Sequence, residues 1–139
     1  MDMKLKKETT NNIPFSLHDS RIRKIEIKGD HLHLYLDQVY EYTEDSEKFY
    51  PATLTFTNID LEECHVLVFD STLENGAFSG VAYQMNDFID LYSDAEFEII
   101  TETYGMNTTF LEGLIFRKGH DPVSAIMSIW TLGDILFDF

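Results

Sequence analysis

Cysteine is nearly absent from this chain, and long apolar runs are absent altogether. Cys64 is the single cysteine in 139 residues, which excludes a scaffold held by internal disulfides and favours a reducing compartment. Apolar runs are as short as VLVF at 66–69, whereas a membrane-spanning helix needs about 20 apolar residues. The N-terminal lysines are not followed by the apolar stretch of a signal peptide. We therefore expect a cytoplasmic protein without membrane association.

Basic residues are also scarce. The chain has 10 Lys and Arg against 25 Asp and Glu, which gives a net charge of −15. Seven of the basic residues lie in residues 1–30, so residues 31–139 carry three basic against 20 acidic side chains. Such a surface repels phosphate backbones and makes nucleic acid a poor partner. It would attract a basic protein, although solubility alone explains an acidic composition equally well.

The composition predicts one globular domain. Apolar residues make up 44% of the chain and aromatic residues 14%. A chain of this length buries roughly two thirds of the surface that its unfolded form exposes. We expect residues 1–14, which end at Pro14, to form a mobile tail, and residues 15–139 to form a single β-rich domain.

The clearest local signal is a β-hairpin within SLHDSRIRKIEIKGDHLHLYLD (16–37). Apolar and polar residues alternate on both sides of Gly29-Asp30, and glycine at the first central position favours a two-residue type II′ turn. This turn places Glu26 opposite His33, as in an exposed cross-strand ion pair. One isoleucine that falls out of phase predicts a β-bulge near Arg23.

Alternation of period two recurs along most of the remaining chain. It predicts strands at 52–59, 64–69, 97–104, 108–116, 123–130 and 134–139, and helical spacing predicts one helix near 85–93. The fold class is therefore mainly β (α+β), an antiparallel sandwich or open barrel of about seven to eight short strands with one helix.

Residues 97–130 have the pattern of a three-stranded meander. Short loops predict the pairs Thr103–Thr109, Ile99–Gly113 and Ile115–Ala125. One face is the expected core: Phe97, Ile99, Leu111, Ile115, Ala125, Met127 and Ile129.

The second face of the meander mixes aromatic and acidic side chains, a composition typical of protein-binding surfaces. Its candidate partner-binding residues are Glu98, Glu102, Tyr104, Phe110, Glu112, Phe116 and Trp130. Two packed layers are the usual arrangement, so we expect the helix or a second sheet to cover this face. If it is uncovered, it is a homodimer contact or a binding site for a basic protein.

An acidic loop within 40–51 is a second candidate of the same character. Its candidate residues are Tyr42, Glu44, Asp45 and Glu47.

Histidines near the hairpin raise the alternative of a metal or acid–base site. His31 and His33 alternate with leucines and point away from the core, whereas His18 and Asp19 would lie roughly 23 Å along the strand from them. Ligand spacing typical of zinc is absent, so we expect no metal and no cofactor. His18 and Asp19 are kept as an alternative polar site, although such residues more often cap a turn.

Sequence motifs of catalysis or nucleotide binding are absent. Cys64 follows two glutamates, which would raise the pKa of its thiol and leave it unactivated. We therefore expect no catalytic residues.

The pattern LHDSRIRKIEIKGDHLHLYLD, followed by FEIITETYG, LEGLIF and a closing strand, resembles small bacterial β-rich domains of unknown function. Some of these domains are proposed as immunity proteins of polymorphic toxin systems. The resemblance covers most of the chain from about residue 15. It implies inhibition of a toxin by binding, and it carries over no catalytic residue.

Together these features predict a non-enzymatic cytosolic binding protein that holds a basic partner, with an immunity-like inhibitor as its most concrete form. One alternative is a small β-barrel that binds a ligand or acts as a hydrolase through His18 and Asp19. Another alternative is a homodimeric structural protein.

Overall fold

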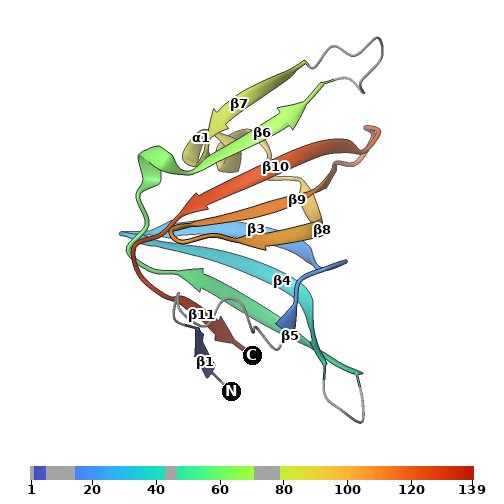
Figure 1. Ribbon diagram of the computed structural model, residues 1–139. Coiled ribbons are helices and arrows are strands. Elements are labelled where there is room, and N and C mark those ends of the chain that lie inside the picture. Colours follow the sequence, from blue (N-terminus) through green and yellow to red (C-terminus); the bar gives the residue numbers. More distant parts are fainter. Residues whose placement is uncertain (1, 6–14, 43–46, 71–78) are drawn as a thin grey trace.

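The structure is a computed structural model that describes residues 2–5, 15–42, 47–70 and 79–139. These residues form eleven strands of one antiparallel sheet and one α-helix (Figure 1). The strands are β1 (Asp2–Leu5), β2 (Phe15–Ser16), β3 (Arg21–Lys28), β4 (His31–Tyr42), β5 (Glu47–Phe56), β6 (His65–Phe69), β7 (Gly80–Gln84), β8 (Glu96–Tyr104), β9 (Thr108–Phe116), β10 (Val123–Trp130) and β11 (Ile135–Asp138). The helices are the short 3-10 helix η2 (Leu61–Glu63) and α1 (Met85–Leu91).

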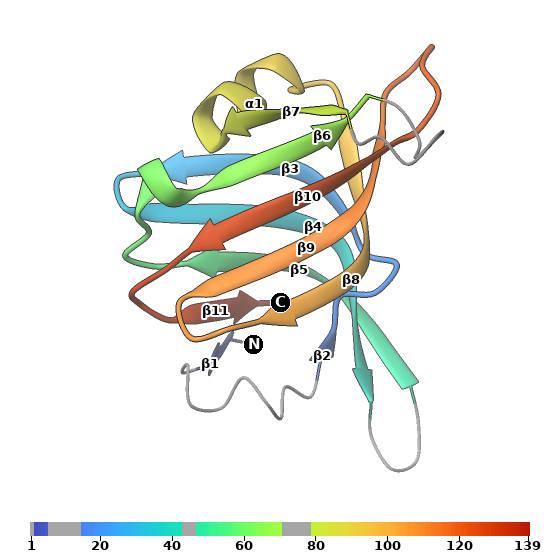
Figure 2. The same cartoon turned by 45° about the horizontal axis from the view of Figure 1, so that its top comes forward.

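The sheet curls so that its two halves face each other across the core. Its strand order is β1-β11-β5-β4-β3-β8-β9-β10-β6-β7, with β2 beside β4. Figures 1 and 2 show β3, β4 and β5 on one side and β8, β9 and β10 on the other. The end strands β1 and β7 do not pair with each other, so the sheet is open and is not a closed barrel.

The core lies between the two halves and is built by strand alternation. Leu34 and Leu54 come from one half, Leu111 and Met127 come from the other, and all four are fully buried. The halves meet at the β3–β8 ladder, where Ile22 pairs with a residue of β8. The mainly β fold with one helix that the sequence predicts is therefore confirmed.

The β3–β4 hairpin follows its predicted register. Glu26 pairs with His33. Gly29 takes a φ of +60°, the positive value that the first central position of a type II′ turn requires. The register shifts between Ile22 and Lys24, which confirms the predicted bulge.

In the meander the predicted core face is confirmed, because all seven of its side chains are buried. The predicted β8–β9 register is only partly right. Ile99 pairs with Gly113 as expected, but Thr103 pairs with Phe110 and not with Thr109. A bulge between Ile99 and Thr101 inserts one residue into β8, and the sequence pattern did not reveal it.

The predicted β9–β10 register is wrong by two residues. Ala125 pairs with Gly113 and not with Ile115. A shift of two leaves every side chain on its predicted face, because side chains alternate with a period of two. The faces were therefore predictable although the loop geometry was not.

Short and peripheral strands account for the difference in strand number. The sequence missed β1, β2 and β7, and it placed residues 40–51 in a polar loop, where the structure has the end of β4 and the start of β5. Part of the predicted tail, Asp2–Leu5, pairs with β11; residues 6–14 lie outside the described residues. The predicted helix near 85–93 is confirmed as α1, which buries Met85 and Phe88.

Replacing Gly113 by alanine should destabilise the sheet. A Cβ atom at this position would overlap the backbone carbonyl oxygen of Glu98, so β8 and β9 would have to separate. We expect a loss of about 1–3 kcal/mol in the free energy of unfolding, the usual cost of overpacking. Urea denaturation measures it, with Ser124→Ala on the exposed side of β10 as the control. Equal stability of the two variants would contradict the close approach.

Candidate functional site

The bulge in β8 separates the predicted partner-binding residues into two groups. Before the bulge, Phe97 and Ile99 are buried and Glu98 faces outward. After it, Glu102 pairs with the buried Leu111 and so shares its inward face. The prediction that Glu102 and Tyr104 belong to an exposed face is therefore wrong, because the inserted residue reverses the alternation.

Glu102 instead connects residues 16 and 17 to β8 through hydrogen bonds. Its Oε1 accepts hydrogen bonds from the Leu17 N–H at 2.8 Å and from the Ser16 hydroxyl at 3.3 Å. Its Oε2 accepts one from the Tyr104 hydroxyl at 2.6 Å. Burial raises the pKa of Tyr104 well above its usual value, and the Glu102 carboxylate raises it further. This arrangement is structural, and its groups face the interior.

The five remaining candidates, together with the outward apolar residues of the same strands, form what we call the outer face. They are Glu98, Ile100, Phe110, Glu112, Leu114, Phe116, Ile126 and Trp130 on β8, β9 and β10.

The centre of the outer face is open to solvent. Phe110 is 41% exposed and Ile100 is 38% exposed. Glu112 lies opposite Ile126 on β10, which in turn lies opposite Leu67 on β6. Among the described residues no helix or second sheet covers this face, contrary to expectation, since α1 lies beside β7 and not over β9 (Figure 2). The exposed centre is therefore mixed in character, because Phe110 lies between Thr103 and Ser128 and Glu112 lies between Thr101 and Ile126.

The end of the outer face near β3 is already occupied by Arg21. Its guanidinium lies 4.3 Å from the ring centre of Phe116 and 3.7 Å from a carboxylate oxygen of Glu98. It also contacts Glu96 at 3.2 Å. These contacts reduce the availability of Phe116 and Glu98 to a partner.

Trp130, at the opposite end, is partly buried and packs against the core. Its backbone N–H lies 3.4 Å from the sulfur of Cys64. Cys64 is fully buried, and burial raises the pKa of its thiol, with nearby Asp60 and Glu63 adding to the effect. The thiol is therefore not activated as a nucleophile.

The acidic loop can be located only in part. Tyr42 pairs with Glu47 at the ends of β4 and β5, so these two residues flank the loop. Glu44 and Asp45 lie outside the described residues.

The hairpin histidines do not converge on a site. His33 Nδ1 lies 2.8 Å from the Thr55 hydroxyl, and burial lowers the pKa of His33. The predicted Glu26–His33 ion pair is wrong, because Glu26 turns to Lys28 at 3.1 Å and to Lys24 at 3.3 Å. Nowhere in the described ranges do three or more His, Cys, Asp or Glu residues gather as a metal site would require.

His18 and Asp19 form a turn that docks on the β8 bulge. Asp19 has a φ of +68° and donates its N–H to the carbonyl oxygen of Ile99 at 2.7 Å. The His18 ring contacts the carbonyl oxygen of Ile100 through Nδ1. Both side chains are more than half exposed and lie 3.5 Å apart. Their geometry suits the turn-capping role that the sequence suggested as the more common one.

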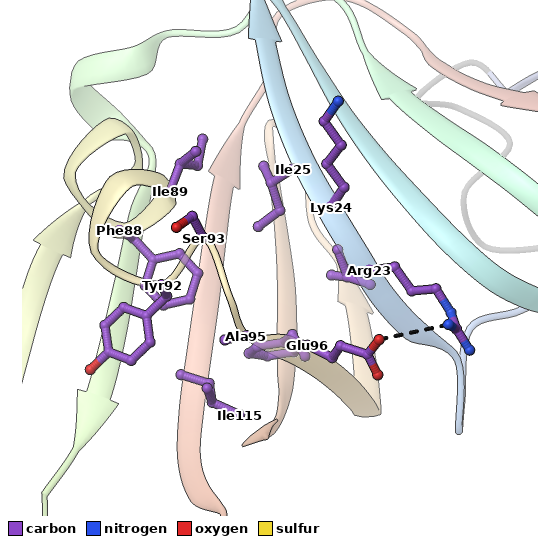
Figure 3. Close-up of a pocket in the computed structure, with 12 residues that line it drawn as sticks. Arg23, Lys24, Ile25, Phe88, Ile89, Tyr92, Ser93, Ala95, Glu96 and Ile115 are labelled. Atoms are coloured by element: carbon purple, nitrogen blue, oxygen red, sulfur yellow. Dashed lines mark ion pairs between the residues drawn. The ribbon is translucent and has the colours of Figure 1, made fainter. Parts of the chain in front are cut away.

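A cavity beside α1 is the feature that sequence reasoning missed. It has a volume of about 400 Å³ and lies where β3 separates from β8 (Figure 3). Its apolar walls include Ile25 of β3, Phe88 and Ile89 of α1, and Ile115 of β9. The walls come from elements far apart in the sequence, so no local pattern predicts the pocket. The predicted bulge near Arg23 is the one sequence signal that lies at its position.

Polar groups lie at the rim of this α1 pocket. Arg23 and Glu96 form an ion pair at 3.7 Å across its edge, and Ser93 lies between α1 and β8. An apolar interior with a few polar groups at the opening is the usual construction of a binding site. Neither His18 nor Asp19 lines the pocket.

No protein-family model, curated protein or solved structure matches the chain. The resemblance to immunity-like domains therefore stays a prediction. None of the helices in the described segments is long and apolar enough to cross a membrane.

Removing the Glu102 carboxylate should weaken the fold, because Glu102→Ala leaves the Leu17 N–H and the Tyr104 hydroxyl without their acceptor. We expect a loss of about 1–3 kcal/mol in the free energy of unfolding. Glu112→Ala is the matched control, since exposed substitutions usually change stability by less than about 0.5 kcal/mol. Chemical denaturation of both variants makes the comparison, and similar losses in both would refute the inward placement of Glu102.

The Glu26 carboxyl should titrate at unusually low pH. Its contacts with Lys28, Tyr35 and Lys24 lower its pKa to about 2. Because the folded-state pKa lies below the unfolded one, the stability from these contacts is present at neutral pH and is lost as the pH falls through about 2. A carbonyl-carbon NMR titration measures the pKa, and Lys28→Met should raise it. An unchanged midpoint in the variant would rule out Lys28 as the main cause.

Proposed function

We propose that this protein is a non-enzymatic binding protein that holds a basic partner protein through the outer face. The observation that carries the proposal is the exposure of two large apolar side chains, Phe110 and Ile100, on the same face as the Glu112 carboxylate. Large apolar side chains that gather exposed on one face, with polar groups around them, are typical of interaction sites. Inhibition of a basic toxin, as the resemblance to immunity-like domains implies, is the most concrete form of this function.

Charge favours a basic partner over an acidic one. The outward side chains of β8, β9 and β10 include Glu98 and Glu112 but no Lys or Arg. Five of the described basic residues, including the Arg21 that covers one end of this face, are already in ion pairs with carboxylates: Arg21, Arg23, Lys24, Lys28 and Arg117. The net charge of −15 would speed the approach of a cationic protein.

The same charge argues against a homodimer built on this face. Two copies packed through the centre of this face would bring Glu112 of one near Glu112 of the other, and like charges in contact oppose association. A partner with Lys or Arg around an apolar centre would meet both requirements of the outer face.

Substitution at the centre of the outer face should abolish partner capture. The double variant Phe110→Ser, Glu112→Lys removes the exposed ring and reverses the central charge. Immobilised protein would be incubated with a lysate of its own organism, washed at low and then high salt, and bound proteins identified by mass spectrometry. We expect a basic protein that the double variant retains about tenfold less, equivalent to ~1.4 kcal/mol of binding free energy.

The control is Asp87→Lys on α1, which reverses one negative charge at an exposed residue of an element that lies beside β7 and away from the outer face. It should retain the partner. Equal retention by all three proteins, or retention of no basic protein by the wild type, would count against the proposed function.

A further inference from the structure

One edge of β3 is unpaired beside the α1 pocket. On its other side, β3 pairs with β4 as far as Lys28 and His31. With β8 it pairs only at Arg21 and Ile22. In the part of the chain that the structure describes, the stretch of β3 after Ile22 therefore has no strand on the side away from β4.

The turn geometry shows which backbone groups point to this edge. In a hairpin with a two-residue loop, the residues that flank the loop exchange both backbone hydrogen bonds, and bonded and non-bonded pairs then alternate. Lys28, Glu26 and Lys24 therefore bond to β4. Ile25 and Ile27 direct their N–H and C=O groups to the open edge, where the described chain offers no backbone partner.

The α1 pocket opens directly against this edge. Ile25 contributes to its wall, together with Phe88 and Ile89 on the facing side of α1 (Figure 3). A strand added to β3 would place the side chain opposite Ile25 on the same side of the sheet, toward the cavity. A volume of about 400 Å³ accommodates one large apolar side chain.

Charge on the far wall restricts what can bind. α1 and the turn after it carry the exposed residues Asp87, Asp90 and Asp94. Arg117 pairs with Asp94 at 3.4 Å and lies over the ring of Tyr92, so the acidic character of this wall rests on Asp87 and Asp90 of α1. On the β3 side, Arg23 is already paired with Glu96 and Lys24 with Glu26.

We propose that the groove between β3 and α1 binds an extended peptide segment of a partner protein as an additional strand on β3. One apolar side chain of the peptide fills the α1 pocket, and a neighbouring basic side chain faces the aspartates of α1. An extended polypeptide fits because it supplies alternating N–H and C=O groups at the spacing that Ile25 and Ile27 present. This binding mode uses a surface separate from the outer face and does not depend on the proposed function.

The test begins with a displayed library of random heptapeptides, panned against the purified full chain. Enriched peptides should share one large apolar residue with a Lys or Arg beside it. NMR of the labelled protein with a synthetic enriched peptide should then show slowed exchange of the Ile25 and Ile27 amide protons. The amides of Lys24 and Glu26 should change little, since they already bond to β4.

Variants test the cavity itself. Ala95→Trp adds a large ring at a residue that lines the pocket and should weaken peptide binding at least tenfold. Leu91→Ala is the control, because Leu91 is an exposed residue of α1 that does not line the pocket, and it should bind normally. The alternating amide pattern in the wild-type protein needs no variant, so the test stands even if Ala95→Trp fails to fold.

Three results would overturn the proposal: a library that yields no enriched peptide, amide changes confined to the outer face, or equal protection of all β3 amides without alternation. Capture experiments with the Phe110→Ser, Glu112→Lys variant address a different surface. If the capture experiment fails, the proposal for the β3 groove is unaffected. If the peptide experiment fails, the proposed function of the outer face is unaffected.

Discussion

Between Ile99 and Thr101, one residue of β8 has no counterpart on β9, and much of the molecule depends on this irregularity. The turn at His18 and Asp19 bonds to the backbone exposed at the bulge. Beyond it, Glu102 faces inward and holds the Leu17 N–H. The bulge therefore both anchors the beginning of the domain and determines which carboxylates face solvent.

The same irregularity marks the limit of what the sequence could predict. The β3–β4 hairpin was predictable because its register follows from a two-residue turn at Gly29 and an alternating pattern on each side. The core face of the meander was predictable because a register error of two preserves the side-chain alternation. Glu102 and Tyr104 were assigned to the wrong face because an insertion of one residue reverses the side-chain alternation. The pattern TETY itself does not distinguish an inward from an outward glutamate.

Sites formed by distant elements were beyond sequence reasoning for another reason. The α1 pocket exists because β3 leaves β8 after Ile22, and its walls come from four separate elements. Neither the divergence nor the resulting open edge has a local signature. The number of charged residues follows from the sequence, but their ion pairs do not. In the structure Arg21 covers Phe116 and neutralises Glu98. Glu112 and Phe110 are therefore the exposed centre of the predicted surface.

The closing strand β11 gives the fold a further property. It pairs with β5, so Phe56 lies beside Ile135, and Arg21 of β3 likewise lies beside Glu98 of β8. Both ladders join segments that are far apart along the chain. Bringing each pair together closes a long loop and costs conformational entropy before any interstrand hydrogen bond can form. Hairpins such as β3–β4 can form in microseconds. Assembly of the complete sheet must wait for these remote pairings, so the protein should fold slowly, on a scale of milliseconds to seconds.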